Sequence, residues 1–221
     1  MNERFKWWIR LPGLGALLFL VGCSAQGPLT MPPPGPAARH VAQGDQRAAV
    51  PIRRFGRVQD PRHPERRIYR GGQPSDDGLR RLAELGVKVL VSLQDVNDQG
   101  EEASDVAHER EMAAELGMTF RNFPITMDGV PSAEAVQGFL AAAREADRQP
   151  VFIHCEWGRD RTGALIAVYR LQEDGYSVEQ SLAEMESYGY EAARYPVLED
   201  FLRAYAASLA PPTREEGPSA A

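Results

Sequence analysis

The chain contains few cysteines, and this scarcity excludes a fold held together by disulfides. Only Cys23 and Cys155 occur among 221 residues. Cys23 directly follows an apolar leader segment and is expected to be modified there, which leaves Cys155 as the only free thiol. With a single free thiol, no disulfide can form within the chain. The folded part must therefore be stabilised by a hydrophobic core of its own.

Clusters of basic residues are also missing. The formal net charge is -6, from 25 Lys and Arg against 31 Asp and Glu. A protein that binds duplex nucleic acid neutralises phosphates with clustered Lys and Arg, so nucleic acid is not an expected partner. The histidines lack the spacing of metal ligands, and we expect neither a metal nor a cofactor. These histidines are His40, His63, His108 and His154.

The apolar run Leu11 to Val21 is too short for a membrane span, which needs ~20 residues to cross a hydrocarbon core of ~30 Å. It follows a basic N-terminal segment, so it predicts a signal peptide. The ending Leu20-Val21-Gly22-Cys23 resembles the lipobox of bacterial lipoproteins. This resemblance implies cleavage before Cys23, lipidation of that residue, and a lipid-anchored protein in the bacterial cell envelope, on the periplasmic face or in the outer membrane. An ordinary secretory signal and an uncleaved anchor are the alternatives.

The composition divides the chain into four segments. Residues 1–22 are the predicted signal peptide, and residues 23–50 form a proline-rich linker that lacks any apolar period and cannot bury a core. Residues 51–209 form the predicted folded domain, and residues 210–221 a disordered tail. A hydrophobic content of 43% with 25% charged residues is typical of a globular domain.

Strand and helix patterns alternate through the predicted domain. Short apolar runs predict strands at 52–58, 67–69, 87–93, 118–125 and 151–153. Helical spacing, with Ser75 and Ser132 as N-caps, predicts helices at 75–85, 101–116, 132–147, 162–174, 178–187 and 196–208. The segment Gly71-Gly72-Gln73-Pro74 predicts an interruption after the second strand, because glycine and proline break regular structure. The alternation predicts a single α/β domain with a mostly parallel central sheet of about four or five strands and helices on both faces.

The segment His154–Gly163, with the sequence HCEWGRDRTG, lies between a predicted buried strand and a predicted buried helix. Backbone N–H groups converge on an anion at such a helix N-terminus. These groups and Arg161 would stabilise a Cys155 thiolate and lower its pKa from about 8.5 to roughly 3.5–7.5. Arginine also has the planar fork that binds two phosphate oxygens. The alternative is that Cys155 is an inert core thiol.

The loop resembles the signature of the protein tyrosine phosphatase and dual-specificity phosphatase superfamily. Cys155 is followed by five residues and then by Arg161, Thr162 and Gly163, and His154 precedes it. The segment 69–75, YRGGQPS, resembles the N-terminal part of bacterial and plant-fungal atypical dual-specificity phosphatases, and the likeness extends over residues 52–209. It implies the cysteine-phosphatase fold and hydrolysis of phosphomonoesters without metal or cofactor.

The resemblance also implies a role for each catalytic residue. Cys155 attacks phosphorus and forms a phosphocysteine, while Arg161 and the loop N–H groups bind the non-bridging oxygens. Asp128, which lies on a predicted loop before the cysteine, protonates the leaving group and then activates water. Asp98 is the alternative acid. Thr162 donates its hydroxyl to the sulfur in the second step.

The rest of the loop supports or surrounds the phosphate. His154 and Gly163 are expected to support its backbone. The phosphate-binding loop comprises Glu156, Trp157, Gly158, Arg159, Asp160 and Arg161. Because Glu156 and Asp160 offset Arg159, the mouth is not predicted to be the strongly cationic funnel that a multiply phosphorylated inositol favours.

A phosphorylated protein is therefore the expected substrate, modified on tyrosine or also on serine or threonine. Small phosphoesters and inositol phosphates remain alternatives, as does a catalytically silent phosphate-binding lipoprotein. Rhodanese-like sulfur transfer and arsenate reduction are less well supported, because arsenate reduction needs further thiols. We expect a monomer.

Overall fold

The computed structural model describes residues 50–96 and 104–209. Cys23, Asp98, His40, the predicted signal peptide, the linker up to residue 49 and the predicted tail lie outside the described residues. The elements are, in chain order, β1 (Gly56–Val58), β2 (Ile68–Gly72), α1 (Asp76–Glu84), β3 (Val89–Ser92), α2 (Ser104–Glu115), β4 (Thr119–Asn122), α3 (Ala133–Arg144), β5 (Val151–Cys155), α4 (Asp160–Tyr169), the π-helix η2 (Arg170–Asp174), α5 (Val178–Ser187) and α6 (Pro196–Leu209). Within this part of the chain, no helix combines the length and apolarity that a membrane crossing requires.

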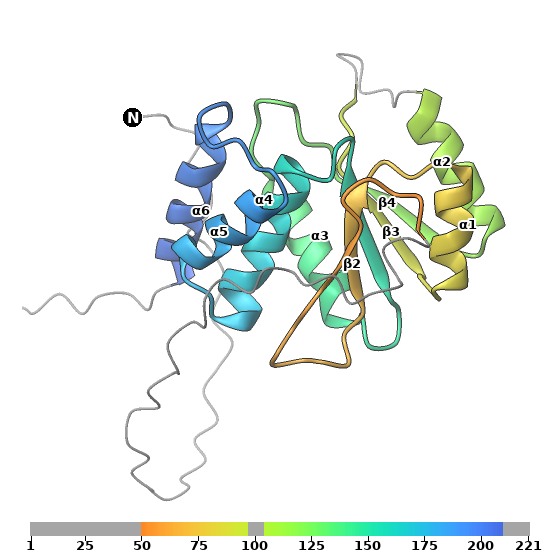
Figure 1. Cartoon of the computed structure of the whole chain (residues 1–221), viewed down its shortest axis with the longest axis horizontal. Coiled ribbons are helices and arrows are strands. Elements are labelled where there is room, and N and C mark those ends of the chain that lie inside the picture. The colour runs from red at the N-terminus through yellow and green to blue at the C-terminus, as the bar shows by residue number, and fades with distance from the viewer. Residues whose placement is uncertain (1–49, 97–103, 210–221) are drawn as a thin grey trace, which may run out of the picture. The chain divides into compact units, whose positions relative to one another are not determined.

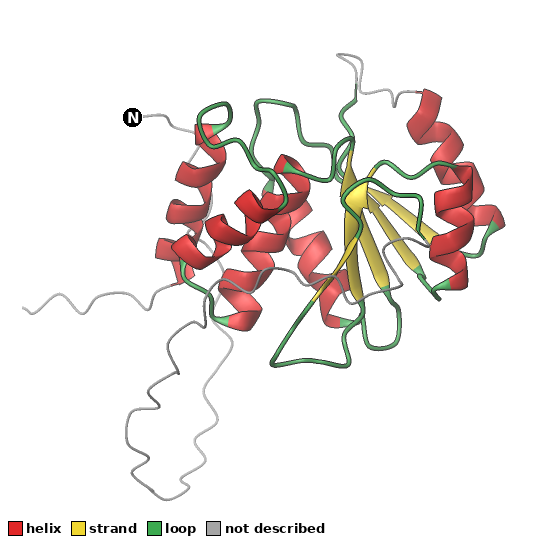
Figure 2. Cartoon of the chain, viewed as in Figure 1, coloured by secondary structure: helices red, strands yellow, loops and turns green. Residues whose placement is uncertain are grey.

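The strands form one sheet in the order β1-β2-β5-β3-β4. β1 pairs antiparallel with β2, and the other neighbours are parallel. Helices α1 and α2 cover one face, and α3 to α6 cover the other (Figure 1; Figure 2 separates the two element types by colour). The predicted α/β architecture is confirmed, with five strands.

The three inner strands β2, β3 and β5 contribute side chains to a hydrophobic core on both faces. Ile68, Val91 and Ile153 belong to the core beneath α3 to α6. Their chain neighbours Tyr69, Leu90 and Phe152 belong to the core beneath α1 and α2. Parallel strands buried on both faces are typically continuous apolar runs, which explains the sequences VLVS and VFIHC.

The helix starts agree with the predicted caps. The Ser75 side chain accepts a hydrogen bond from the backbone N–H of Gly78, and Ser132 accepts one from Ala135. The helix that follows the cysteine loop begins at Asp160, two residues earlier than predicted, and its last turn is the π-helix η2. The cysteine loop is correspondingly shorter than the sequence indicated.

The predicted interruption after the second strand begins at Gln73, two residues later than the sequence indicated. Both glycines belong to β2, where they pair with His154 and Cys155 of β5. A Cβ atom on Gly71 would lie 2.7 Å from Ile52 Cγ2, and one on Gly72 would lie 2.9 Å from the carbonyl oxygen of Glu156. Glycine therefore serves close packing here, and β2 ends at Gly72.

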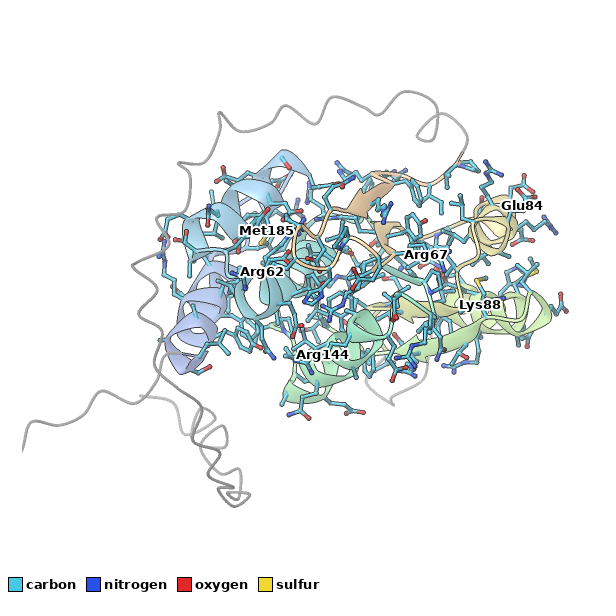
Figure 3. All side chains as sticks on the ribbon, turned by 90° about the horizontal axis from the view of Figure 1, so that it is seen from below. Arg62, Arg67, Glu84, Lys88, Arg144 and Met185 are labelled. Atoms are coloured by element: carbon cyan, nitrogen blue, oxygen red, sulfur yellow. The ribbon has the colours of Figure 1, made fainter. Side chains whose placement is uncertain are left out.

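A polar network lies at the C-terminal end of α4, away from the cysteine loop. The Tyr169 hydroxyl donates to Asp60, and Arg170 Nε lies 2.7 Å from Glu184 Oε2. Arg144, labelled in Figure 3, lies 2.8 Å from Glu173 on η2. Burial and the neighbouring Asp60 raise the pKa of Asp174 to about 6.

Candidate active site

Cys155 is the last residue of β5, which lies between β2 and β3 in the sheet. The loop 156–159 turns the chain from this strand into α4, so the helix N-terminus lies directly after the loop. Free N–H groups at a helix N-terminus favour an anion. The thiol is free and only 2% exposed. The fold thus places the one described cysteine where an anion would bind.

The surroundings of Cys155 stabilise its thiolate. Burial raises the pKa of the thiol, but the Arg161 charge, the Thr162 hydroxyl and the backbone N–H groups of Thr162 and Arg159 together outweigh burial, so the pKa is lowered. Since the thiolate is the reactive form of cysteine, these surroundings favour a reactive Cys155.

The Arg161 side chain is hydrogen-bonded to the segments that follow β3 and β4, which are neighbouring parallel strands. Its Nη1 donates to the carbonyl oxygen of Leu93 at 3.2 Å, just after β3, and to that of Ile125 at 3.0 Å, after β4. The side chain is 8% exposed. A buried guanidinium held from two directions is preorganised for a phosphate group.

Thr162 and Gly163 continue the loop into α4. Thr162 is fully buried, and its hydroxyl has no nitrogen or oxygen partner among the described residues. The hydroxyl is therefore available to the sulfur. A Cβ atom on Gly163 would lie 3.1 Å from Met185 Cγ, on α5, which Figure 3 labels. Gly163 thus allows α5 to pack closely on the start of α4.

Two cavities open beside the loop. The first has a volume of about 270 Å³ and includes the cysteine; it is lined by Met127, Cys155, Glu156, Trp157, Arg159, Asp160, Arg161, Arg194 and Tyr195. The second has a volume of about 290 Å³ and is lined by Gln94, Asp95, Asp105, Val106, Met127, Glu156 and Arg161. The loop side chains predicted at the mouth thus lie at the mouth of the first cavity.

The proposed acid, Asp128, does not line the cavity that contains the sulfur. Asp128 is exposed on a turn after β4, and it lines neither of these cavities, although its neighbour Met127 lines both. The alternative acid, Asp98, lies outside the described residues. The role of Asp128 stays a prediction.

His154 lies in a buried polar network that the sequence did not indicate. Its Nε2 is 2.9 Å from Oε1 of Glu109 on α2, and both side chains are almost fully buried. The other oxygen of Glu109 accepts from Gln73, whose amide oxygen in turn accepts from Gln94. This chain ties β5 to α2 and to the segment after β2. Glu109 lies among the buried apolar residues Val106, Met112 and Ala113 of its helix, and this break in the apolar stripe was the available signal.

Three further arginines that sequence reasoning missed lie around the mouth. The Arg53 guanidinium stacks 4.3 Å from the centroid of a Trp157 ring, and Arg54 Nη1 donates to the Trp157 carbonyl oxygen at 3.2 Å. Arg194 lines the first cavity. Arg194 also lies 3.8 Å from Glu191, and Arg159 is paired with Asp160 at 2.9 Å. The mouth is more cationic than the loop sequence predicted.

No cluster of His, Cys, Asp and Glu in residues 50–96 and 104–209 has an arrangement suited to a metal ion. The fold, the activated cysteine and the anchored arginine define a protein-tyrosine-phosphatase-like phosphoric monoester hydrolase. The chain belongs to the family described as DSP-PTPase phosphatase fused to NAD+ kinase, whose profile matches residues 48–199.

Curated relatives match about half of the chain. A probable chloroplastic NAD kinase 2 of Oryza sativa is 31% identical over 104 residues, 47% of this chain and 10% of the plant protein. The dual specificity protein phosphatase TpbA of Pseudomonas aeruginosa is 29% identical over 124 residues, 56% of this chain and 51% of TpbA. The chain therefore matches no more than about half the length of these relatives.

Solved structures share the fold. A putative phosphatase (DUF442) of Shewanella putrefaciens aligns with a TM-score of 0.54 at 22% identity, covering 71% of this chain and 90% of the other. The catalytic domain of the PP-IP phosphatase Siw14 of Saccharomyces cerevisiae aligns with a TM-score of 0.56 at 20% identity, covering 71% and 87%.

Proposed function

We propose that the protein hydrolyses phosphomonoesters through a phosphocysteine intermediate, and that its substrates are proteins phosphorylated on tyrosine or also on serine or threonine. The observation that supports this proposal best is the thiol of Cys155. It is buried, has a lowered pKa, and lies beside Arg161 at a cavity that is open to solvent.

The reaction proceeds in two displacements. The Cys155 thiolate forms a bond to phosphorus while the bond from phosphorus to the leaving oxygen breaks, and Asp128 gives that oxygen its proton. Water then attacks the phosphocysteine, Asp128 takes a proton from the water, and the sulfur leaves as thiolate with the Thr162 hydroxyl donating to it. Arg161 and the loop N–H groups bind the non-bridging oxygens throughout.

Para-nitrophenyl phosphate turnover by the full chain tests the activity. Cys155→Ser should abolish turnover while phosphate still binds, and Arg161→Ala should lose both functions. A wild-type chain that binds phosphate and does not hydrolyse the ester would instead identify a silent binding protein.

The acid has its own test, because it acts only on the leaving group. Asp128→Asn should slow hydrolysis of an alkyl phosphate by about 10²- to 10⁴-fold and affect para-nitrophenyl phosphate far less. The contact between Arg161 and the Ile125 carbonyl supports this role, since it ties the loop that carries Asp128 to the phosphate site. Asp95→Asn, at a carboxylate that lines the second cavity, is the matched control. An unchanged rate on the alkyl phosphate would reject Asp128 as the acid.

The mouth of the first cavity supports an aromatic phosphoester. Trp157 is 45% exposed and Met127 is 55% exposed, and these two apolar side chains flank the cysteine. They offer contact area to a phosphotyrosine ring. The relative TpbA, described as a dual specificity phosphatase, agrees with this substrate class.

A second candidate substrate is a polyanion such as an inositol phosphate, which Arg53, Arg54 and Arg194 favour electrostatically. A panel of phosphopeptides and inositol phosphates separates the two substrates by kcat/KM. Trp157→Ala should reduce kcat/KM for the phosphotyrosine peptide most. The polyanion would be the substrate if the wild type had a higher kcat/KM for an inositol phosphate than for the peptide, and if Arg53→Ala combined with Arg54→Ala removed that activity.

We also propose that Cys23 is lipidated and anchors the domain in the bacterial envelope. The proposal rests on the apolar leader and its ending at this residue. Expression in a bacterial host with labelled palmitate should label the wild-type membrane fraction, and Cys23→Ser should remove the label. Equal labelling of both would reject the anchor.

A further inference from the structure

Arg70 is a charged residue at a core position of the sheet. It is the third residue of β2, it is paired with Ile153 of β5, and it is fully buried. Its alternate neighbour Ile68 belongs to the core beneath α3 to α6, so Arg70 points toward the same helices. Burial of a guanidinium is strongly unfavourable unless partners compensate it.

Arg70 has few partners in its buried position. Its Nη2 donates to the carbonyl oxygen of Gly158 at 3.0 Å, and its guanidinium carbon lies 3.7 Å from the centroid of the Tyr188 ring. The Nε and Nη1 atoms have no hydrogen-bond partner among the described residues, and within those residues Arg70 forms no ion pair. A side chain kept only for stability would be better replaced by an apolar one.

The partner that Arg70 does have is a peptide group of the phosphate-binding loop. Gly158 and Arg159 share this peptide, and it is trans. In a trans peptide the C=O and the N–H point in opposite directions. Arg70 binds the C=O, and the N–H of Arg159 donates to the sulfur of Cys155. Arg70 and the thiolate therefore lie at opposite ends of one peptide dipole.

The backbone of Gly158 makes this peptide orientation possible. Its φ of +68° lies in the left-handed region, and a Cβ atom there would lie 2.3 Å from the carbonyl carbon of Gly71. The loop thus rests directly on the segment that carries Arg70. A donor beneath the loop both fixes the peptide and, by polarising it, strengthens donation by the N–H on the other side.

We propose that Arg70 is a positioning residue that holds the Gly158–Arg159 peptide with its N–H directed at Cys155 and at the bound phosphate. It acts through the loop and does not touch the reacting atoms. This role rests on the proposed phosphatase function and adds to it a cation on the core side of the loop, opposite to Arg161. Phosphate affinity and thiol acidity should therefore both depend on Arg70.

The test measures thiol acidity directly. In the full chain carrying Cys23→Ser, Cys155 is the only thiol, and the pH dependence of its alkylation by iodoacetamide reports its pKa. Arg70→Met should raise that pKa by about one pH unit or more. It should also weaken inhibition by inorganic phosphate about tenfold or more, which a merely structural role would not do.

Two further variants make the result interpretable. Arg66→Met removes a largely buried arginine that bonds to Tyr169 and Glu173 at the other end of α4, so it should lower stability without changing the alkylation profile. Arg70→Lys keeps the charge and loses the planar fork, so it should give a smaller rise in the thiol pKa. If Arg70→Met does not fold, Arg70→Lys decides the question.

The inference is overturned if a folded Arg70 variant, Met or Lys, has the wild-type alkylation profile and the wild-type phosphate inhibition. Alkylation does not require turnover, so the outcome is separate from that of the proposed function. A wild-type chain without phosphatase activity, in which Arg70→Met still shifts the thiol pKa, would reject the function and keep the role of Arg70.

Discussion

Substitution of Gly158 by alanine should disrupt the phosphate-binding loop through backbone contact. The glycine has a φ of +68°, and an added Cβ atom would lie 2.3, 2.4 and 2.5 Å from the Gly71 carbon, the Gly71 oxygen and the Gly72 nitrogen. Non-bonded heavy atoms prefer about 3.5–4.0 Å. Since Gly71 and Gly72 are paired to β5, the loop must move away from them.

Gly117 provides a matched control, because it separates backbone strain from collision. Its φ is +70°, and an added Cβ atom would meet nothing within 4 Å. Gly117→Ala should therefore cost only the left-handed backbone strain, about 1–2 kcal/mol. Gly158→Ala has the same strain and also loses the bonds from Arg70 to Gly158 and from Gln73 to Glu156, each worth about 1 kcal/mol. Its total cost should be about 3–4 kcal/mol.

Urea denaturation of the full chain measures both free energies of unfolding, and iodoacetamide alkylation measures the state of Cys155. Gly158→Ala should raise the pKa of the thiol, and Gly117→Ala should leave it unchanged. Equal destabilisation by the two alanines, together with an unchanged thiol pKa in Gly158→Ala, would refute the argument that the loop rests on β2.

Two further substitutions test buried charges. Glu109→Ala should destabilise the fold by about 1–3 kcal/mol in urea denaturation, because it leaves the buried His154 ring and the Gln73 amide without their polar partner; an unchanged free energy of unfolding would contradict that pairing. Asp174 has its pKa raised to about 6 by burial and by Asp60, above its ordinary 3.8, so its stabilising contribution is full at low pH and is lost as the pH rises through 6. Between pH 4 and 6 the wild type should lose about 2 kcal/mol of its free energy of unfolding through this group, and Asp174→Asn should not show this loss. Parallel profiles of the free energy of unfolding against pH for the two proteins would contradict this.

Much of the fold follows from local signals. The cap residues Ser75 and Ser132 define helix starts through hydrogen bonds that span only three residues, so the sequence carries the whole interaction. The apolar runs in β3 and β5 likewise indicate strands buried on both faces. Signals of this kind were sufficient to predict the alternating order and hence the parallel sheet.

The inclusion of Gly71 and Gly72 in the second strand could not be predicted. Glycine is typical of turns, but these two residues pair with β5 and accept the close approach of Ile52 and Glu156. Local propensity is a weak prior where distant segments pack against each other. These two glycines lie next to the active site, where the phosphate-binding loop packs directly against backbone that carries no side chains.

The sequence alone determined the phosphate-binding loop and the residues proposed for its chemistry. A cysteine and an arginine separated by five residues lie between a strand and a helix, so the loop and its anion-binding geometry are local in the chain. Only the tertiary structure decided what surrounds that loop. Arg70 comes from β2 and Arg53 from the turn before β1, and both contact the loop, while Glu109 of α2 contacts His154 just before it. Interactions between residues so far apart in the chain depend on the whole fold, since no local pattern specifies which side chains it brings into contact.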